Sequence, residues 1–293
     1  MGKYIIEINK LTKYYGKHRG IEDVTFSVQE GEIYGFIGPN GAGKSTTIRT
    51  LLALLHPTSG NATIFGKDCI KYASEISKDV GYLPAEVSYY EKMTVKDLFN
   101  YSSALYGIDC SSRVEELSQR LQLDIKRKIR ELSLGNKKKV GIVQALMHSP
   151  RLLILDEPTS GLDPLMQQTF FDILHEERKK GTTILFSSHV LSEVQKLCDK
   201  VAIIKEGKII GLQKMSELIE NGYKKITLTA KDEIPKGYFN NDEVANYQQN
   251  QKHATFIFKG DVNRMLEKIW RLQLRDVLIE EPTLEEIFMN YYR

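Results

Sequence analysis

Residues 33–46 read IYGFIGPNGAGKST, a short apolar run followed by a glycine-rich loop. The loop, residues 38–45, matches the pattern G-x-x-x-x-G-K-[ST], which lies between a strand and a helix. Its glycines let successive backbone N–H groups point into one concavity that binds phosphate oxygens, and the following helix adds its positive end. The stretch therefore predicts a site for a nucleoside triphosphate, whereas a merely glycine-rich turn would leave the full match unexplained.

The side chains of this loop have distinct expected roles. Lys44 supplies a mobile cation for the β- and γ-phosphates, and the Ser45 hydroxyl can coordinate Mg²⁺. We expect the phosphates to be held by the whole run, namely Gly38, Pro39, Asn40, Gly41, Ala42, Gly43, Lys44, Ser45 and Thr46.

A second apolar run, residues 152–157, reads LLILDE and ends in two carboxylates. Adjacent carboxylates at the end of a buried strand are costly unless a metal or a cation pairs with them. Asp156 is placed to hold Mg²⁺, usually through water, and Glu157 to act as a general base on an attacking water. The alternative is an ordinary solvated strand end. The pattern favours hydrolysis over transfer of the phosphoryl group to a substrate.

Length and composition limit the number of domains, the class of partner and the compartment of the protein. The chain has 293 residues, enough for roughly two domains, and a formal charge of +3, which does not indicate a nucleic-acid partner. Its three cysteines are widely spaced and fit a reducing compartment. No run approaches the ~20 apolar residues of a membrane span, and no signal peptide opens the sequence. We expect a cytoplasmic chain, for which any membrane role must come through a separate subunit.

The order of apolar and polar runs predicts an α/β fold. Short apolar runs alternate with helical periods from about residue 33 to 204, which indicates β/α units on a largely parallel sheet. A mostly helical stretch interrupts them, so we expect a helical subdomain at about 88–148. The composition changes near Asn221, which predicts an ATPase domain over 1–220 and a small α/β accessory or dimerisation domain over 221–293.

Individual elements follow from the same patterns. We expect Trp270 in the core of the C-terminal domain, and the basic runs 126–128 and 137–139 as solvated faces. Strands are expected at 33–37, 152–155, 183–186, 201–204, 208–211, 225–229, 254–258 and 276–279, and helices at 44–55, 136–147, 214–220, 262–272 and 283–291.

Further motifs, in a characteristic order, resemble those of the ABC ATPase family. Residues 132–136, LSLGN, resemble the signature motif LSGGQ, and residues 160–163, SGLD, resemble the D-loop. His189 resembles the switch histidine, and Tyr15 the aromatic residue that stacks on adenine. The resemblance covers about residues 3–220. It implies a P-loop NTPase core of the ABC type, with a mixed sheet, an antiparallel β subdomain and an inserted helical subdomain.

The resemblance also implies a composite site. Two protomers would close head-to-tail over two Mg-ATP, with Ser133 and Gly135 of one protomer facing the γ-phosphate held by the other. His189 would sense that γ-phosphate. The alternative interpretation of residues 132–136 is a simple helix cap, and that of His189 an ordinary strand-end histidine. The partner protomer is a second copy or a paralogous ATPase.

Two departures from the family pattern affect this expectation. The signature has Leu134 for a glycine and Asn136 for the glutamine, which can weaken the contact to the γ-phosphate. The Q-loop glutamine aligns with Ala85, which cannot coordinate a metal or water. Glu86 could substitute from the next position, but we expect its side chain to point elsewhere. The adjoining segment 87–93 either receives a short helix of a transmembrane subunit or packs locally, and the sequence leaves both open.

Residues 279–288 resemble the tails of bacterial ABC-2-type exporter ATPases, and YLPAEV at 82–87 resembles the antimicrobial-peptide and antibiotic-efflux branch. This implies an ATP-hydrolysing subunit, peripheral on the cytoplasmic face of the membrane, that drives a transmembrane permease through the 82–93 surface. The alternatives are a low-turnover regulatory ATPase, which Ala85 favours, and a soluble ABC ATPase of translation or DNA repair. The transported substrate cannot be inferred.

Overall fold

The computed structural model describes residues 3–220, 223–282 and 286, which form two compact units, Met1–Leu212 and Gln213–Arg293. The division falls slightly earlier in the chain than the boundary expected from composition, because the helix α8 (Met215–Glu220) groups with the second unit. In the described ranges, no helix has the combination of length and apolarity needed to cross a membrane.

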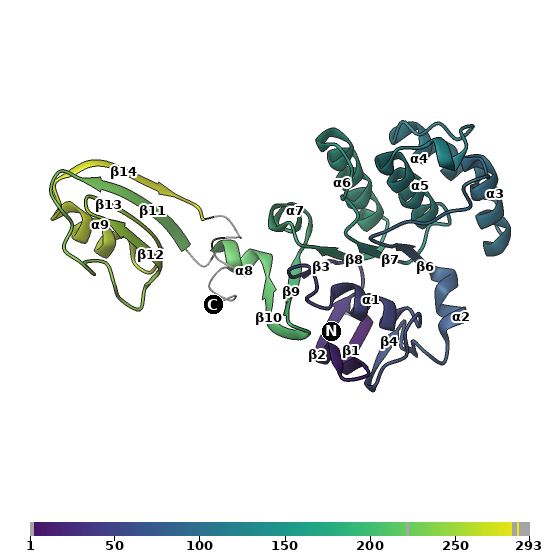
Figure 1. The fold of residues 1–293 in the computed structure, drawn as a ribbon, viewed down its shortest axis with the longest axis horizontal. Coiled ribbons are helices and arrows are strands. Elements are labelled where there is room, and N and C mark those ends of the chain that lie inside the picture. Colours follow the sequence, from purple (N-terminus) through teal and green to yellow (C-terminus); the bar gives the residue numbers. More distant parts are fainter. Residues whose placement is uncertain (1–2, 221–222, 283–285, 287–293) are drawn as a thin grey trace. The chain divides into compact units, whose positions relative to one another are not determined.

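A six-stranded sheet forms the centre of the first unit (Figure 1). Its strand order is β10-β9-β3-β8-β7-β6, and the pairs β3–β8, β3–β9, β7–β8 and β6–β7 are parallel. The central strands β3, β7 and β8 are buried along their whole length, which fits their mostly apolar sequences. Their bounds are β3 Ile33–Ile37, β6 Val80–Leu83, β7 Leu152–Asp156, β8 Thr183–Ser188, β9 Lys200–Lys205 and β10 Lys208–Lys214.

A second sheet, of antiparallel strands in the order β2-β1-β4-β5, shares its core with the first. The Phe26 ring stacks on Tyr34 of β3 at 5.4 Å between centroids. Helix α1 (Lys44–Leu51) contributes Ile48 and Leu51 to this core. The strands are β1 Tyr4–Tyr15, β2 His18–Gln29, β4 Ser59–Ile64 and β5 Lys67–Asp68.

Helix α1 is shorter than the helix expected over 44–55. It ends at Leu51, and Ala53 adopts a left-handed conformation with φ 57°, which breaks the helical path.

Helices fill the interval between β6 and β7 as expected, and they pack on one another beside the central sheet (Figure 1). Arg113 and Arg120 of α4 pair with Glu177 and Glu176 of α6, so two ion pairs tie this helical region to the β/α core. The elements of this region are α3 Val95–Tyr106, α4 Ser111–Arg120, η2 Ile129–Glu131 and α5 Leu134–Leu146. Elsewhere in the unit lie α2 Ala73–Ile76, η1 Ser77–Asp79, α6 Pro164–Lys179 and α7 Leu191–Leu197.

A buried histidine makes this helical region sensitive to acid. His148 follows α5, is 9% exposed, and stacks on Tyr106 at 3.9 Å between ring centroids. Burial lowers the pKa of His148 to about 4. Because the unfolded chain binds the proton first, near pH 6.5, stability decreases as the pH falls from about 6.5 to about 4.

We predict that His148 accounts for about 2 kcal/mol of stability lost between pH 7 and pH 5. His148→Phe keeps the stacked ring but does not titrate. The stability that this variant loses between pH 7 and pH 5 should therefore be smaller than that of the wild type by about 2 kcal/mol. Urea unfolding at the two pH values measures the difference. Equal losses in the two proteins would contradict the prediction.

The second unit has an antiparallel sheet in the order β12-β13-β11-β14, and helix α9 (Val262–Trp270) packs on it through Met265 and Ile269. Its strands are β11 Tyr223–Ala230, β12 Val244–Asn250, β13 His253–Lys259 and β14 Leu274–Glu280. Strand β12 was not expected, because its sequence VANYQQN is mostly polar. The helix expected at 283–291 lies outside the described residues, apart from Glu286.

The expectation that Trp270 belongs to the core of this unit is wrong, since its side chain is 87% exposed. Trp270 shares an i, i+4, i+8 stripe with Val262 and Leu266, which are also exposed. The neighbouring stripe, with Met265 and Ile269, faces the sheet. Two apolar stripes fit the helical period, and only packing selected one of them.

Candidate functional site

The phosphate-loop residues form the turn from β3 into α1, as the sequence predicted. Gly41 and Gly43 have positive φ values of 78° and 109°, which glycine adopts without strain. A Cβ on Gly38 would lie 2.3 Å from the Ile204 carbonyl oxygen, so this position also requires glycine. The first N–H groups of a helix have no intrahelical acceptor, so the start of α1, enclosed by this loop, is a place where an anion can bind.

Lys44 joins this loop to the carboxylate that follows β7. Its side chain is 5% exposed, and Nζ donates to the carbonyl oxygens of Gly38 at 2.6 Å and Pro39 at 3.3 Å. The same Nζ lies 3.1 Å from Glu157 Oε1. The parallel sheet thus brings together two motifs more than a hundred residues apart, because the carboxyl ends of β3 and β7 lie at the same edge.

Asp156 ends β7 inside the protein, where it is 1% exposed. Its Oδ1 accepts a hydrogen bond from Ser187 Oγ of β8 at 3.0 Å. Its Oδ2 is buried and has no hydrogen-bond partner among residues 3–220 and 223–282. An ionised buried oxygen without a partner is costly, so this atom is suited to a cation or to a water bound to one.

Glu157 lies between two nitrogen-bearing side chains. Besides the contact with Lys44, its Oε2 lies 2.7 Å from Nδ1 of His189, whose side chain is 48% exposed. Glu157 has a φ of 48°, an uncommon conformation for a residue other than glycine, and its N–H donates to the Ser187 carbonyl. The turn after β7 therefore aims this carboxylate toward both Lys44 and His189, and strain of this kind is concentrated at functional sites.

The residue before His189 is fixed by its own hydrogen bonds. Ser188 Oγ donates to the buried Glu193 Oε2 and accepts from the Val190 N–H, both at 2.9 Å. These bonds hold the turn after β8, so the backbone from which the His189 side chain extends is fixed beside Glu157.

Residues 132–136 start the helix α5. Ser133 is its N-cap and accepts a hydrogen bond from the Asn136 N–H at 3.3 Å, so the helix begins at Leu134, earlier than the expected Asn136. Gly135 packs on the loop at 160–163, since a Cβ there would lie 2.6 Å from the Gly161 carbonyl oxygen. The structure therefore places Gly135 beside the Ser160–Asp163 turn of its own chain.

Tyr15 lies at the end of β1, with 45% of its side chain exposed. A Cβ on Gly20 would meet the Tyr15 ring at 2.8 Å and Thr46 of α1 at 3.1 Å, so the ring and the phosphate-loop helix both lie close to Gly20. An exposed ring in this position can stack on a planar group bound beside the loop.

Comparisons with known proteins agree with this arrangement. The family model described as "ABC transporter" matches residues 21–160. The bacitracin transport ATP-binding protein BcrA of Bacillus licheniformis is 38% identical over 299 residues, covering 98% of this chain and 96% of BcrA. The chain belongs to the ABC transporter family. It is an ATP-binding subunit, and its core has the P-loop ABC fold.

Other ABC proteins extend the comparison. The ABC transporter ATP-binding protein NatA of Bacillus subtilis is 36% identical, with 69% of this chain and 85% of NatA covered. A solved structure titled "Structure of ATP binding subunit of ABC transporter" is 31% identical and aligns with a TM-score of 0.69 over 74% of this chain and 92% of that one.

The Q-loop position of this ABC chain follows β6. Ala85 offers no polar side-chain atom, but Lys138 of α5 donates from Nζ to the carbonyl oxygens of Pro84 and Ala85, at 3.1 and 3.0 Å. The expectation that Lys138 is solvated is wrong, because it is 2% exposed. It lies one turn before the buried Ile142, and this helical spacing in the sequence could have indicated its burial.

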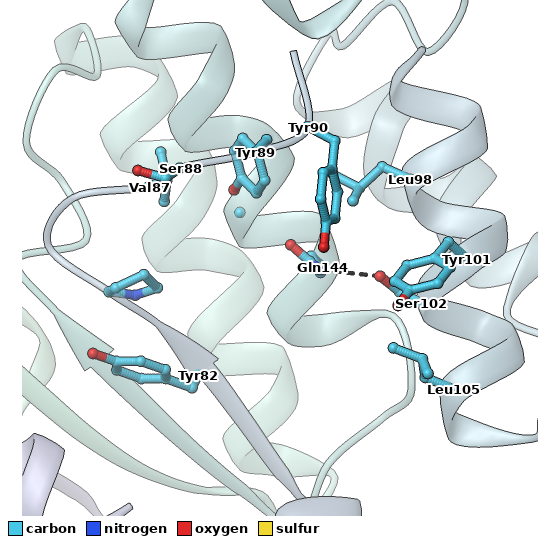
Figure 2. Close-up of a pocket in the computed structure, with 12 residues that line it drawn as sticks. Tyr82, Val87, Ser88, Tyr89, Tyr90, Leu98, Tyr101, Ser102, Leu105 and Gln144 are labelled. Atoms are coloured by element: carbon cyan, nitrogen blue, oxygen red, sulfur yellow. Dashed lines mark hydrogen bonds between the residues drawn. The ribbon is translucent and has the colours of Figure 1, made fainter. Parts of the chain in front are cut away.

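A groove of about 500 Å³ opens beside the Q-loop (Figure 2). The segment after β6 forms one side, with Tyr89 and Tyr90, and α3 and α5 form the rest. Gln144 Nε2 donates to Ser102 Oγ at 3.0 Å across its floor. Its rim exposes apolar side chains, since Tyr90, Tyr101 and Leu105 are 66, 48 and 70% exposed.

Proposed function

We propose that the chain hydrolyses ATP and that two copies close head-to-tail over two ATP molecules to drive an exporter. The observation that supports this best is the position of Glu157, 3.1 Å from the Lys44 ammonium and 2.7 Å from the His189 imidazole. A carboxylate held between a phosphate-binding lysine and a histidine is suited to accept a proton from a water that attacks the γ-phosphate.

Each residue has a defined part in this reaction. Lys44 turns from the loop carbonyls to the β- and γ-phosphates, and this releases Glu157 for the attacking water. His189 orients Glu157 and donates to the γ-phosphate. Tyr15 stacks on adenine. Ser133 and Gly135 of the second copy complete the site from the N-terminal end of its α5.

The residues present also fit Mg²⁺. Asp156 Oδ2 is a buried oxygen without a partner among the described residues, and Ser45 carries a hydroxyl in the first turn of α1, next to Lys44. Hard oxygen ligands of this kind are those that Mg²⁺ prefers. Ser45 and Asp156 would hold the ion, which neutralises phosphate charge when bound.

Coupling to transport requires a separate transmembrane permease, and this would hold the chain against the cytoplasmic face of the membrane. The groove beside residues 82–93 is the surface we assign to the permease. BcrA is named for bacitracin transport, which supports a peptide antibiotic as the class of cargo. Ala85 favours a second candidate, a regulatory ATPase with low turnover.

The size of the Glu157→Gln protein with and without Mg-ATP tests the composite site. Binding should persist while water activation is lost, so light scattering should show a monomer that becomes a dimer with ATP. Ser133→Arg in the same background is the matched control, because it blocks the contact to the other copy but leaves the phosphate loop intact. A monomer that binds ATP would exclude the homodimer, and a chain that binds no nucleotide would refute the proposal.

The groove gives a prediction about the permease. Tyr90→Glu places a charge on the exposed apolar rim, so we expect ATP-dependent transport by the assembled complex to fall about tenfold or more, while binding of ATP is retained. Tyr72→Glu is the matched control, because Tyr72 is 40% exposed and does not line the groove. Equal transport by the two variants would contradict this assignment.

A further inference from the structure

Lys138 is a buried ammonium group that the reaction above does not use. It lies in α5, one turn after the N-cap Ser133, and is 2% exposed. None of the ion pairs in the described part of the chain includes it, and its hydrogen-bond acceptors are the backbone carbonyls of Pro84 and Ala85. A buried lysine is costly unless its donors are satisfied, so these two bonds fix where the loop after β6 lies.

The electrostatic surroundings of Lys138 agree with this geometry. Burial lowers its pKa to about 8, while the nearby carboxylates Asp156 and Glu157 act in the opposite direction. The group therefore remains mainly charged near neutral pH. Bonds from a charged donor are about twice as strong as neutral ones, and the low dielectric of the interior strengthens them further.

The same loop contacts α5 at two further points. Tyr89 Oη lies 3.5 Å from the Lys137 carbonyl oxygen. A Cβ on Gly141 would meet Leu83 at 2.6 Å and Tyr89 Oη at 2.7 Å, so the missing side chain lets the loop lie directly on the helix. Residues 83–89 therefore follow the first two turns of α5.

We propose that Lys138 is a positioning residue that fastens the Q-loop to the signature helix, so that the two move as one body. Lys138 holds the loop through its backbone carbonyls, because Ala85 offers no polar side-chain atom. One end of α5 presents Ser133 and Gly135, and the fastened loop lines the groove. When the signature residues of one copy move onto the ATP held by the other, the loop that lines the groove therefore moves with them. This consequence rests on the proposed function.

Hydrogen exchange of the full-length Glu157→Gln protein, with and without Mg-ATP, tests this linkage. Lys138→Met removes the ammonium but keeps an unbranched apolar side chain, and Lys139→Met is the matched control on the same helix. Without ATP, amides of residues 85–93 should exchange about tenfold faster in Lys138→Met than in Lys139→Met, since a charge-assisted bond is lost. With ATP, exchange should slow over both 133–136 and 85–93 in the control, but only over 133–136 in Lys138→Met.

A merely structural role would lower the melting temperature of Lys138→Met, whereas we expect no decrease, because removing a buried charge offsets the lost bonds. If this variant does not fold, Lys138→Gln, which is uncharged and one bond shorter, replaces it. Equal exchange over 85–93 in the Lys138 variant and the control would overturn the linkage. Failure of ATP to slow exchange at 133–136 in the parent would refute the composite site instead, and the comparison without ATP would still decide the role of Lys138.

Discussion

Glu157→Gln should lower the rate of ATP hydrolysis by roughly 10²–10⁴-fold, the usual effect of removing a general base. The amide has the shape of the carboxylate and can keep the 2.7 Å contact with His189, but it does not accept a proton from water. The charge 3.1 Å from Lys44 is also lost, so ATP affinity should not decrease.

Phosphate release and equilibrium nucleotide binding, measured on the same preparations, separate these two effects. Glu206→Gln is the matched control, because it makes the same chemical change at an exposed turn, where Glu206 pairs with Arg19 at 3.7 Å. Turnover in Glu157→Gln above about a tenth of the wild-type rate would show that another group acts as the base.

Gly81→Ala should destabilise the first unit by about 3 kcal/mol, at the upper end of the usual cost of overpacking. Gly81 lies in β6, and a Cβ there would come within 2.0 Å of the Ala145 carbonyl oxygen. That atom belongs to the backbone of α5, so the helix itself must move. Because α5 presents Ser133 and Gly135, formation of the ATP-bound dimer should weaken as well.

The shift in the urea midpoint measures this cost. Gly211→Ala is the control, since its new Cβ would meet only the flexible end of Ile203, at 3.0 Å, and we expect less than about 1 kcal/mol there. Similar midpoints for the two variants would mean that α5 tolerates displacement from β6.

Local patterns predicted most of the elements around the site. The runs at 33–37, 152–155 and 183–186 are strands, as expected, because strands covered on both faces need continuous apolar sequence. Lys44 and Glu157 meet in the structure because parallel strands bring their carboxyl ends to one edge. Burial of Lys138 was not expected, because a lysine inside a basic run is usually solvated. Exposure of Trp270 was not expected, because α9 carries two apolar stripes and only one of them faces the sheet.

The sequence by itself determined the phosphate loop, the acidic strand end and the family, because each depends on residue types at short, fixed spacings. Only the tertiary structure decided how Lys138 meets the Q-loop carbonyls, how Gly135 meets Gly161 and which face of α9 is buried. These contacts join segments far apart in the chain, and their selection depends on packing and desolvation over the whole fold rather than on local spacing.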